Sequence, residues 1–145
     1  MTYVVDCSTA LQWEIPEPDS SRAIRLREEY RNGTLNLLAP DLFPAEVGNA
    51  SIVAERKVRL QPGQFAIVIA DILASCPELH ESRLLVPRAC ALIASITSGF
   101  RLSFYDALYV ALAQREGCEL VSGDMKLVRN LQAQYPFIIA VSAMP

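Results

Sequence analysis

The sequence predicts an α/β fold with a central parallel sheet, on the evidence of two features. Short apolar segments rich in strand-forming residues alternate with longer segments of helical periodicity along the chain. The 145 residues, of which 52% are hydrophobic and 20% charged, match the size and composition of one compact α/β domain. We therefore expect a single domain over residues 1–145, with roughly four to five short strands flanked by helices.

The first half of the chain alternates strand formers with capped helices. A Tyr-Val-Val segment at residues 3–5 favours a strand, and Ser8 or Thr9 is a suitable cap for a short helix that Pro16 terminates. Gly33 marks the end of the next helix. The predicted order is a strand at 3–5, helices at 8–13 and 19–32, a strand at 35–38, and helices at 42–57 and 64–75.

In the second half, the helix predicted at residues 102–117 organises the rest. Ser103 is a good N-cap, and Asp106 suits the positive end of the helix dipole. The residues that follow are apolar or small on nearly every face, which predicts a helix buried flat against the sheet. Around it we expect a strand at 84–86, a helix at 87–98 beginning with Pro87, a strand at 118–121, a helix at 125–134 capped by Asp124, and a strand at 137–141.

The cysteine and histidine content argues against several kinds of site. The four cysteines are scattered without a CxxC pair, so they lack the spacing of a zinc site and are expected to be buried, reduced thiols. His80 is the single histidine and falls in a polar segment that predicts an exposed loop. Ser-His-Asp and Cys-His catalysis would depend on that one loop residue and are not expected.

Charge and hydropathy limit the partners. The formal net charge is −3, so no overall field attracts nucleic acid. Local basic residues are candidates for phosphate contact, although a solvated helix face or a helix C-terminus explains them more simply; they are Arg22, Arg25, Arg56, Lys57 and Arg59. No apolar run is long enough to span a bilayer, and the first residues lack a basic-then-apolar leader, so a cytoplasmic protein without membrane contact is expected.

Acidic residues from four segments are predicted to meet at one edge of the sheet. Asp6 follows the first strand and Asp124 lies just beyond the strand at 118–121, and the carboxyl ends of parallel strands share one rim. Asp106 opens the buried helix, and Glu46 falls on the apolar stripe of the helix at 42–57, where an unpaired carboxylate is costly. Each acid alone is also explained as a cap, turn or surface residue. Together, without a second histidine or paired cysteines, they predict an oxygen-only site for Mg²⁺ or Mn²⁺.

Four segments carry a resemblance to a known family. They are VVDCS with Asp6, PAEVGN with Glu46, SFYDALYVALA with Asp106 and LVSGDMKL with Asp124. In order and approximate spacing they resemble the PIN-domain ribonucleases, closest to the VapC-type toxins of bacterial type II toxin–antitoxin pairs. Ser122 stands where the family most often has threonine, which keeps a hydroxyl, and Asn49 also fits the pattern; both would support the acidic site.

The resemblance implies a PIN-like fold and metal-dependent endoribonuclease activity. On that model Asp6 and Asp106 are the principal ligands of one or two Mg²⁺ or Mn²⁺ ions, and Glu46 and Asp124 complete the cluster directly or through water. The metal would polarise the scissile phosphate and activate an attacking water. The family also implies a homodimer and a cognate antitoxin that crosses the active-site groove, while the RNA target, commonly tRNA or rRNA, varies.

Other function classes stay open beside the toxin. A catalytically silent PIN-like binding module would normally lack at least one of the acids, whereas a housekeeping PIN ribonuclease would keep them. A phosphoacceptor receiver domain requires an acidic pair after the first strand, where this chain has Asp6 alone, and its Lys126 falls inside a predicted helix. An aspartate-nucleophile hydrolase requires an acid where Ser8 stands.

Overall fold

Five strands form the central sheet of the computed structural model, which describes residues 1–145. They are β1 (Thr2–Val5), β2 (Asn36–Pro40), β3 (Glu78–His80), β4 (Glu119–Ser122) and β5 (Ile138–Ala140), in the spatial order β3-β2-β1-β4-β5. All neighbouring strands pair in parallel, as the alternation of strands and helices requires. The predicted α/β fold with a parallel sheet is confirmed.

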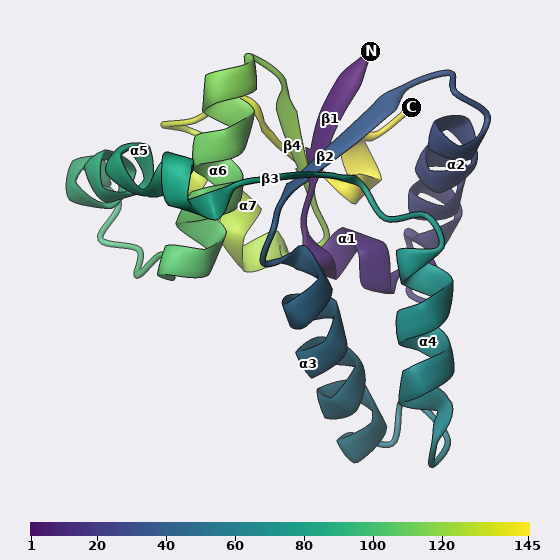
Figure 1. The fold of residues 1–145 in the computed structure, drawn as a ribbon. Helices are drawn as coiled ribbons and strands as arrows, with labels where there is room; N and C mark the ends of the chain where they lie inside the picture. Colours follow the sequence, from purple (N-terminus) through teal and green to yellow (C-terminus); the bar gives the residue numbers. More distant parts are fainter.

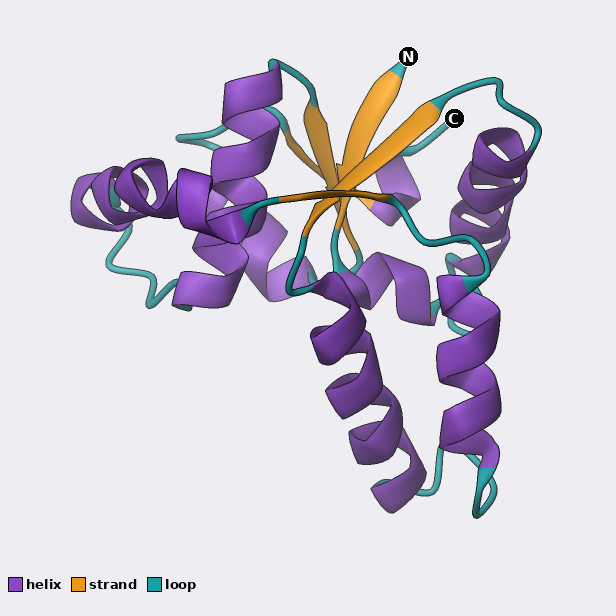
Figure 2. Ribbon diagram, viewed as in Figure 1, coloured by secondary structure: helices purple, strands orange, loops and turns teal.

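Helices cover the sheet on both sides, as Figure 2 shows. They are α1 (Cys7–Leu11), α2 (Ser20–Arg31), α3 (Phe43–Arg56), α4 (Gln64–Leu73), α5 (Ser82–Ser95), α6 (Phe104–Glu116), α7 (Met125–Leu131) and the 3-10 helix η1 (Val141–Ala143). α5, α6 and α7 lie on one side of the sheet, and α1 and α2 lie on the other (Figure 1). α3 and α4 pack together as a hairpin that projects past the end of the sheet where the strands finish. None of these helices is both long enough and apolar enough to cross a membrane.

The buried helix α6 connects the two halves of the sheet. Its N-cap Ser103 accepts a hydrogen bond from the backbone N–H of Asp106 at 3.0 Å, and Gly117 ends it in the left-handed conformation with φ of 64°. Every residue from Ala107 to Ala113 is buried, and the helix contacts β1, β2 and β4. The prediction of a helix that is apolar on nearly every face and buried against the sheet is therefore confirmed for Ala107–Ala113.

The third strand and the helix after it depart from the prediction. The segment at 84–86 belongs to α5, and the strand is instead β3, which contains His80. His80 is therefore not an exposed loop residue, and its Nδ1 lies 2.8 Å from a guanidinium nitrogen of Arg115. α5 begins early because the carboxylate of Asp41 accepts a 3.1 Å hydrogen bond from the N–H of Ser82, its first residue. Pro87 consequently lies inside α5 and not at its first position.

Smaller differences concern a cap and the thiols. Neither Ser8 nor Thr9 caps α1, because the carboxylate of Asp6 fills that position. The cysteines are all free, as expected. The expectation that they are buried is correct for Cys7 but wrong for Cys90, which lies on the exposed face of α5.

Candidate active site

The carboxyl ends of β1 and β4 lie at the point where the order of the strands in the sheet reverses. From β1 the chain proceeds to β2 and β3 on one side, and it returns through α5 and α6 to β4 and β5 on the other. Open parallel sheets bind ligands in the crevice at such a switch point. Val5 pairs with Val121 at this end of the two strands, so Asp6 and Ser122 follow side by side.

Asp6 is buried, with 7% of its surface exposed, and hydrogen bonds hold both of its carboxylate oxygens. Oδ1 accepts from the hydroxyl of Ser8 at 2.6 Å and from the backbone N–H of Thr9 at 2.9 Å, which makes Asp6 the N-cap of α1. Oδ2 accepts from the hydroxyl of Ser122 at the end of β4. Burial raises the pKa of Asp6, and these hydrogen bonds oppose the rise because they stabilise the charged carboxylate.

The turn after β4 packs closely against the loop after β1. The N–H of Gly123 donates to Ser8 Oγ at 2.9 Å, and the N–H of Asp124 donates to Ser122 Oγ at 3.0 Å. A Cβ atom at Gly123 would lie 2.6 Å from Gln12 Nε2 and 3.0 Å from the carbonyl oxygen of Ser8, so the turn requires glycine. Asp124 caps α7 through Oδ1, as predicted, and its Oδ2 has no protein partner.

Glu46 and Asp106 reach the same crevice from the first turns of α3 and α6. Burial raises the pKa of Glu46 to about 6, and the nearby charges of Asp106 and Asp6 add to the rise. Burial also raises the pKa of Asp106; the hydroxyl of Ser103 opposes this rise, while the charges of Asp6 and Asp124 add to it. The carboxylates therefore interact electrostatically, and both helix acids hold their protons to higher pH than an exposed acid does.

One hollow of about 230 Å³ brings the four predicted acids together, and Asp6, Glu46, Asp106 and Asp124 all line it. The acids come from four separate segments of the chain, and apolar Leu11 and Ala50 complete part of the wall. The convergence at the carboxyl edge that the strand order predicts is thus present in the structure.

The donor set of the hollow fits a hard cation. Its ionisable acids are four carboxylates, whose oxygens are ligands that Mg²⁺ and Mn²⁺ prefer. Oε1 of Glu46 is buried without a hydrogen-bond partner, which is costly unless a proton or cation meets it. As the side chains stand, no group of three or more histidine, cysteine or acidic residues is gathered closely enough to hold an ion. Ligation of an ion would therefore require the acidic side chains to come closer together.

Sequence reasoning missed the roles of two residues at the hollow. Tyr109 heads the fully buried side chains by size, and its hydroxyl, close to Glu46, makes no well-formed hydrogen bond. The hydroxyl of Thr9 joins α1 to β4 by donating to the carbonyl oxygen of Val121 at 2.8 Å. Tyr109 was detectable, because it follows Asp106 by three positions and so shares a helix face with it. The Thr9 hydrogen bond joins residues that are far apart in the sequence, so no local sequence pattern predicts it.

The basic residues proposed for RNA contact lie outside the acidic hollow. Arg22 and Arg25, on α2, already contact partners within the protein. Arg56 and Lys57 stand at the end of α3, beyond the lining residue Ala50 by roughly 9 Å along the helix at about 1.5 Å per residue. Arg59, just beyond them, is ion-paired. Asn49 lies on α3 and lines the neighbouring hollow instead.

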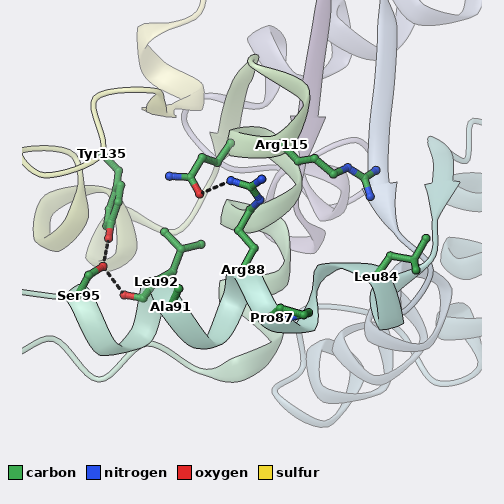
Figure 3. A pocket seen from close by; sticks show the side chains of 9 residues that line it. Leu84, Pro87, Arg88, Ala91, Leu92, Ser95, Arg115 and Tyr135 are labelled. Carbon is green, nitrogen blue, oxygen red and sulfur yellow. Dashed lines mark hydrogen bonds between the residues drawn. The ribbon is translucent and has the colours of Figure 1, made fainter.

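Another hollow, of about 620 Å³, lies between α5 and α6 and shares no lining residue with the acidic one. Figure 3 shows Arg88 and Arg115 at this hollow, together with Ser95 and Tyr135, whose hydroxyl oxygens are 2.6 Å apart. No acidic residue lines it, so it offers neither carboxylate ligands nor a carboxylate base. The acidic hollow is therefore the candidate active site.

No protein-family model matches the sequence, and no curated protein matches it. Two solved structures resemble the chain over nearly its full length. The crystal structure of PAE2754 from Pyrobaculum aerophilum is 25% identical, with a TM-score of 0.65, and the match covers 98% of this chain and 93% of that chain. A chain of VapBC2 from Rickettsia felis, crystallised with a DNA fragment from the promoter, is 15% identical, with a TM-score of 0.58 and 97% of each chain covered. The five-stranded sheet and its helices match these neighbours, and the fold is PIN-like.

Proposed function

We propose that this chain is a metal-dependent endoribonuclease and the toxin of a type II toxin–antitoxin pair. The observation that carries the proposal is the hollow at the switch point of a PIN-like sheet, where Asp6, Glu46, Asp106 and Asp124 converge. A carboxylate cluster of this kind suits phosphodiester hydrolysis, because metal ions held there supply positive charge to the scissile phosphate and acidify the attacking water.

We expect the acidic side chains of the hollow to have different roles. Asp6 is held rigidly by Ser8, Thr9 and Ser122, so it fixes one side of the site. Asp106 and Glu46 are the less constrained acids, and they adjust to the ligand. We expect Asp6 and Asp106 to be the principal metal ligands, with the others acting directly or through water.

The partners are part of the same proposal. The VapBC2 structure holds two components on promoter DNA, and by analogy we propose that a cognate antitoxin binds this chain. A homodimer is proposed as well. Light scattering on the purified protein, alone and with the antitoxin encoded beside it, measures both.

The deciding experiment is cleavage of total small RNA by the purified, antitoxin-free protein. Mg²⁺ or Mn²⁺ is compared with EDTA, for the parent and for Asp6→Asn and Asp106→Asn. The matched control is Asp71→Asn, because Asp71 is an exposed acid on α4 that makes no hydrogen bond or ion pair. We expect metal-dependent cleavage by the parent and the control, and a loss of at least about 100-fold in both site variants.

Two results would contradict the proposal. Cleavage that survives both site substitutions would exclude the acidic hollow as the active site. A folded parent that binds Mn²⁺ and the antitoxin but cleaves no RNA from its own host would favour the catalytically silent binding module.

A further inference from the structure

A hollow of about 390 Å³ adjoins the acidic one and has a different character. The two hollows share Cys7, Glu46 and Ala50 as lining residues, so one continues into the other along α3. The remaining wall of the second hollow comes from the start of α3 and from Tyr105 in the first turn of α6.

The walls of this second hollow suit a flat ring with a polar edge. Leu42, Ala45 and Ala50 supply apolar surface, and the Tyr105 side chain stands at the hollow with 63% of the residue exposed. The exposed tyrosine ring presents a large flat apolar face with a polar edge, and no protein group covers that face. The amide of Asn49 is exposed and makes no hydrogen bond within the protein, so it remains available to a ligand. No arginine or lysine lines the hollow, which makes it a poor phosphate site.

Tyr105 and Asn49 in the second hollow lie close in sequence to two acids of the first hollow. Asn49 follows Glu46 by three positions, so these two side chains share one face of α3, and Tyr105 directly precedes Asp106 in α6. A nucleotide chain with one phosphate among the acids would therefore have a base within reach of the second hollow.

We propose that this hollow is a nucleobase subsite for single-stranded RNA, in which Tyr105 stacks on a base flanking the cleaved phosphate and Asn49 contacts its edge. The inference rests on the proposed ribonuclease function. Bases of single-stranded RNA are free to unstack from their neighbours, and proteins bind them on aromatic rings and through amide hydrogen bonds. Paired RNA would hold its bases away from the ring, so the subsite selects loops and unpaired ends.

The test measures RNA affinity in an Asp106→Asn background, which removes cleavage. Fluorescein-labelled homopolymers of A, C, G and U, about twelve nucleotides long, are titrated in Mg²⁺ by anisotropy. Tyr105→Ala is compared with Tyr105→Phe, which keeps the ring, and with Phe104→Ala as the matched control. Phe104 is the preceding aromatic residue, 40% exposed, and it does not line the hollow. An abasic RNA oligomer of the same length, which has the sugar–phosphate backbone without bases, is titrated as a further control.

We expect Tyr105→Ala to raise the Kd by about 5- to 100-fold, whereas Tyr105→Phe and Phe104→Ala change it by less than about twofold. The abasic oligomer should bind weakly and respond equally to every variant. We expect Asn49→Ala to reduce the differences in Kd among the four homopolymers.

Equal affinities of Tyr105→Ala and Phe104→Ala would overturn the inference, and would leave the exposed ring to a protein partner. Failure of the subsite is distinguishable from failure of the ribonuclease proposal, because cleavage of small RNA by the parent is measured separately. If the parent neither cleaves RNA nor binds any homopolymer, the ribonuclease proposal fails and the subsite fails with it.

Discussion

The acidic hollow has two halves that the protein treats differently. On the strand side, Asp6 and Asp124 are caps of α1 and α7, and their carboxylates accept backbone N–H groups. On the helix side, Glu46 and Asp106 stand in the first turns of α3 and α6 without well-formed hydrogen bonds, and burial raises the pKa of both. The strand-side acids are therefore also structural caps, whereas the helix-side acids have no such structural role.

This difference shows that an acid at such a site can either stabilise the fold or destabilise it. Asp6 stabilises the fold, since removing it would leave the hydroxyl of Ser122 and the backbone N–H of Thr9 without an acceptor. Ionised Glu46 should destabilise the fold, because burial disfavours its charge more than the nearby Tyr109 hydroxyl favours it. Substitutions of Asp6 and of Glu46 should consequently change the free energy of unfolding in opposite directions.

The largest expected effect is that of Asp6→Ala on stability. The variant loses the N-cap of α1 and leaves buried donors unsatisfied, so we expect the free energy of unfolding to fall by about 3 kcal/mol. Asp106→Ala keeps the backbone hydrogen bond to Ser103 and loses only the weak contact of its carboxylate with the Ser103 hydroxyl, so it should change the free energy of unfolding by less than about 0.5 kcal/mol. Urea denaturation at neutral pH in EDTA measures both. Equal losses in the two variants would contradict the division of the hollow into a structural side and a ligand side.

The next effect concerns the close approach of the β4–α7 turn to the β1–α1 loop. Gly123→Ala places a methyl group 3.0 Å from a backbone oxygen of Ser8, which cannot move freely, and we expect a loss of about 2 kcal/mol. Gly48→Ala is the matched control, because in α3 the added methyl meets nothing nearer than Ile69 Cδ1 at 3.9 Å. There the better helix propensity of alanine should stabilise the fold by about 0.5–1 kcal/mol. Thermal unfolding of both variants tests the prediction, and a neutral Gly123→Ala would show that the two loops are not tightly fitted.

Much of this hollow was predictable because it depends on local pattern and on sheet topology. Parallel strands end at one rim, so Asp6 and Asp124 had to lie near each other once β1 and β4 were recognised as neighbours. The position of Asp106 in the first turn of α6 was likewise predictable from the cap Ser103 and the apolar residues that follow. Helix caps and buried helix faces depend on short stretches of sequence.

The features that the sequence did not predict depend on contacts between distant segments. Serine and threonine are common caps, so Ser8 and Thr9 were natural candidates for α1, yet Asp6 takes that role within a network that includes Ser122 from β4. The start of α5 depends in the same way on Asp41, which precedes Ser82 by a whole helical hairpin. Three-residue β3 is too short for an alternating pattern to reveal it.

The smallest expected effect, a gain in stability, tests the ligand side of the hollow. The pKa of Glu46 rises from 4.5 to about 6 on folding, so the folded state binds more protons between these values. The free energy of unfolding must then fall as the pH rises through that window, and the loss is complete above it. Glu46→Gln removes this loss, and we expect the variant to exceed the parent by up to about 1 kcal/mol near pH 7.5, a value reduced for partial solvation. Near pH 4 and below, where Glu46 is mostly protonated in both states, the two proteins should be about equally stable.

Urea denaturation in EDTA at the two pH values measures this gain, with the exposed Glu28→Gln on α2 as the control that should show no difference between them. Saturating Mn²⁺ should reverse the order at the higher pH. A metal that binds the folded parent through ionised carboxylates stabilises it by mass action, whereas the neutral amide of Glu46→Gln weakens that binding. If Glu46→Gln is instead less stable than the parent in EDTA, Glu46 has a structural role after all, and the contrast between the two sides of the hollow disappears.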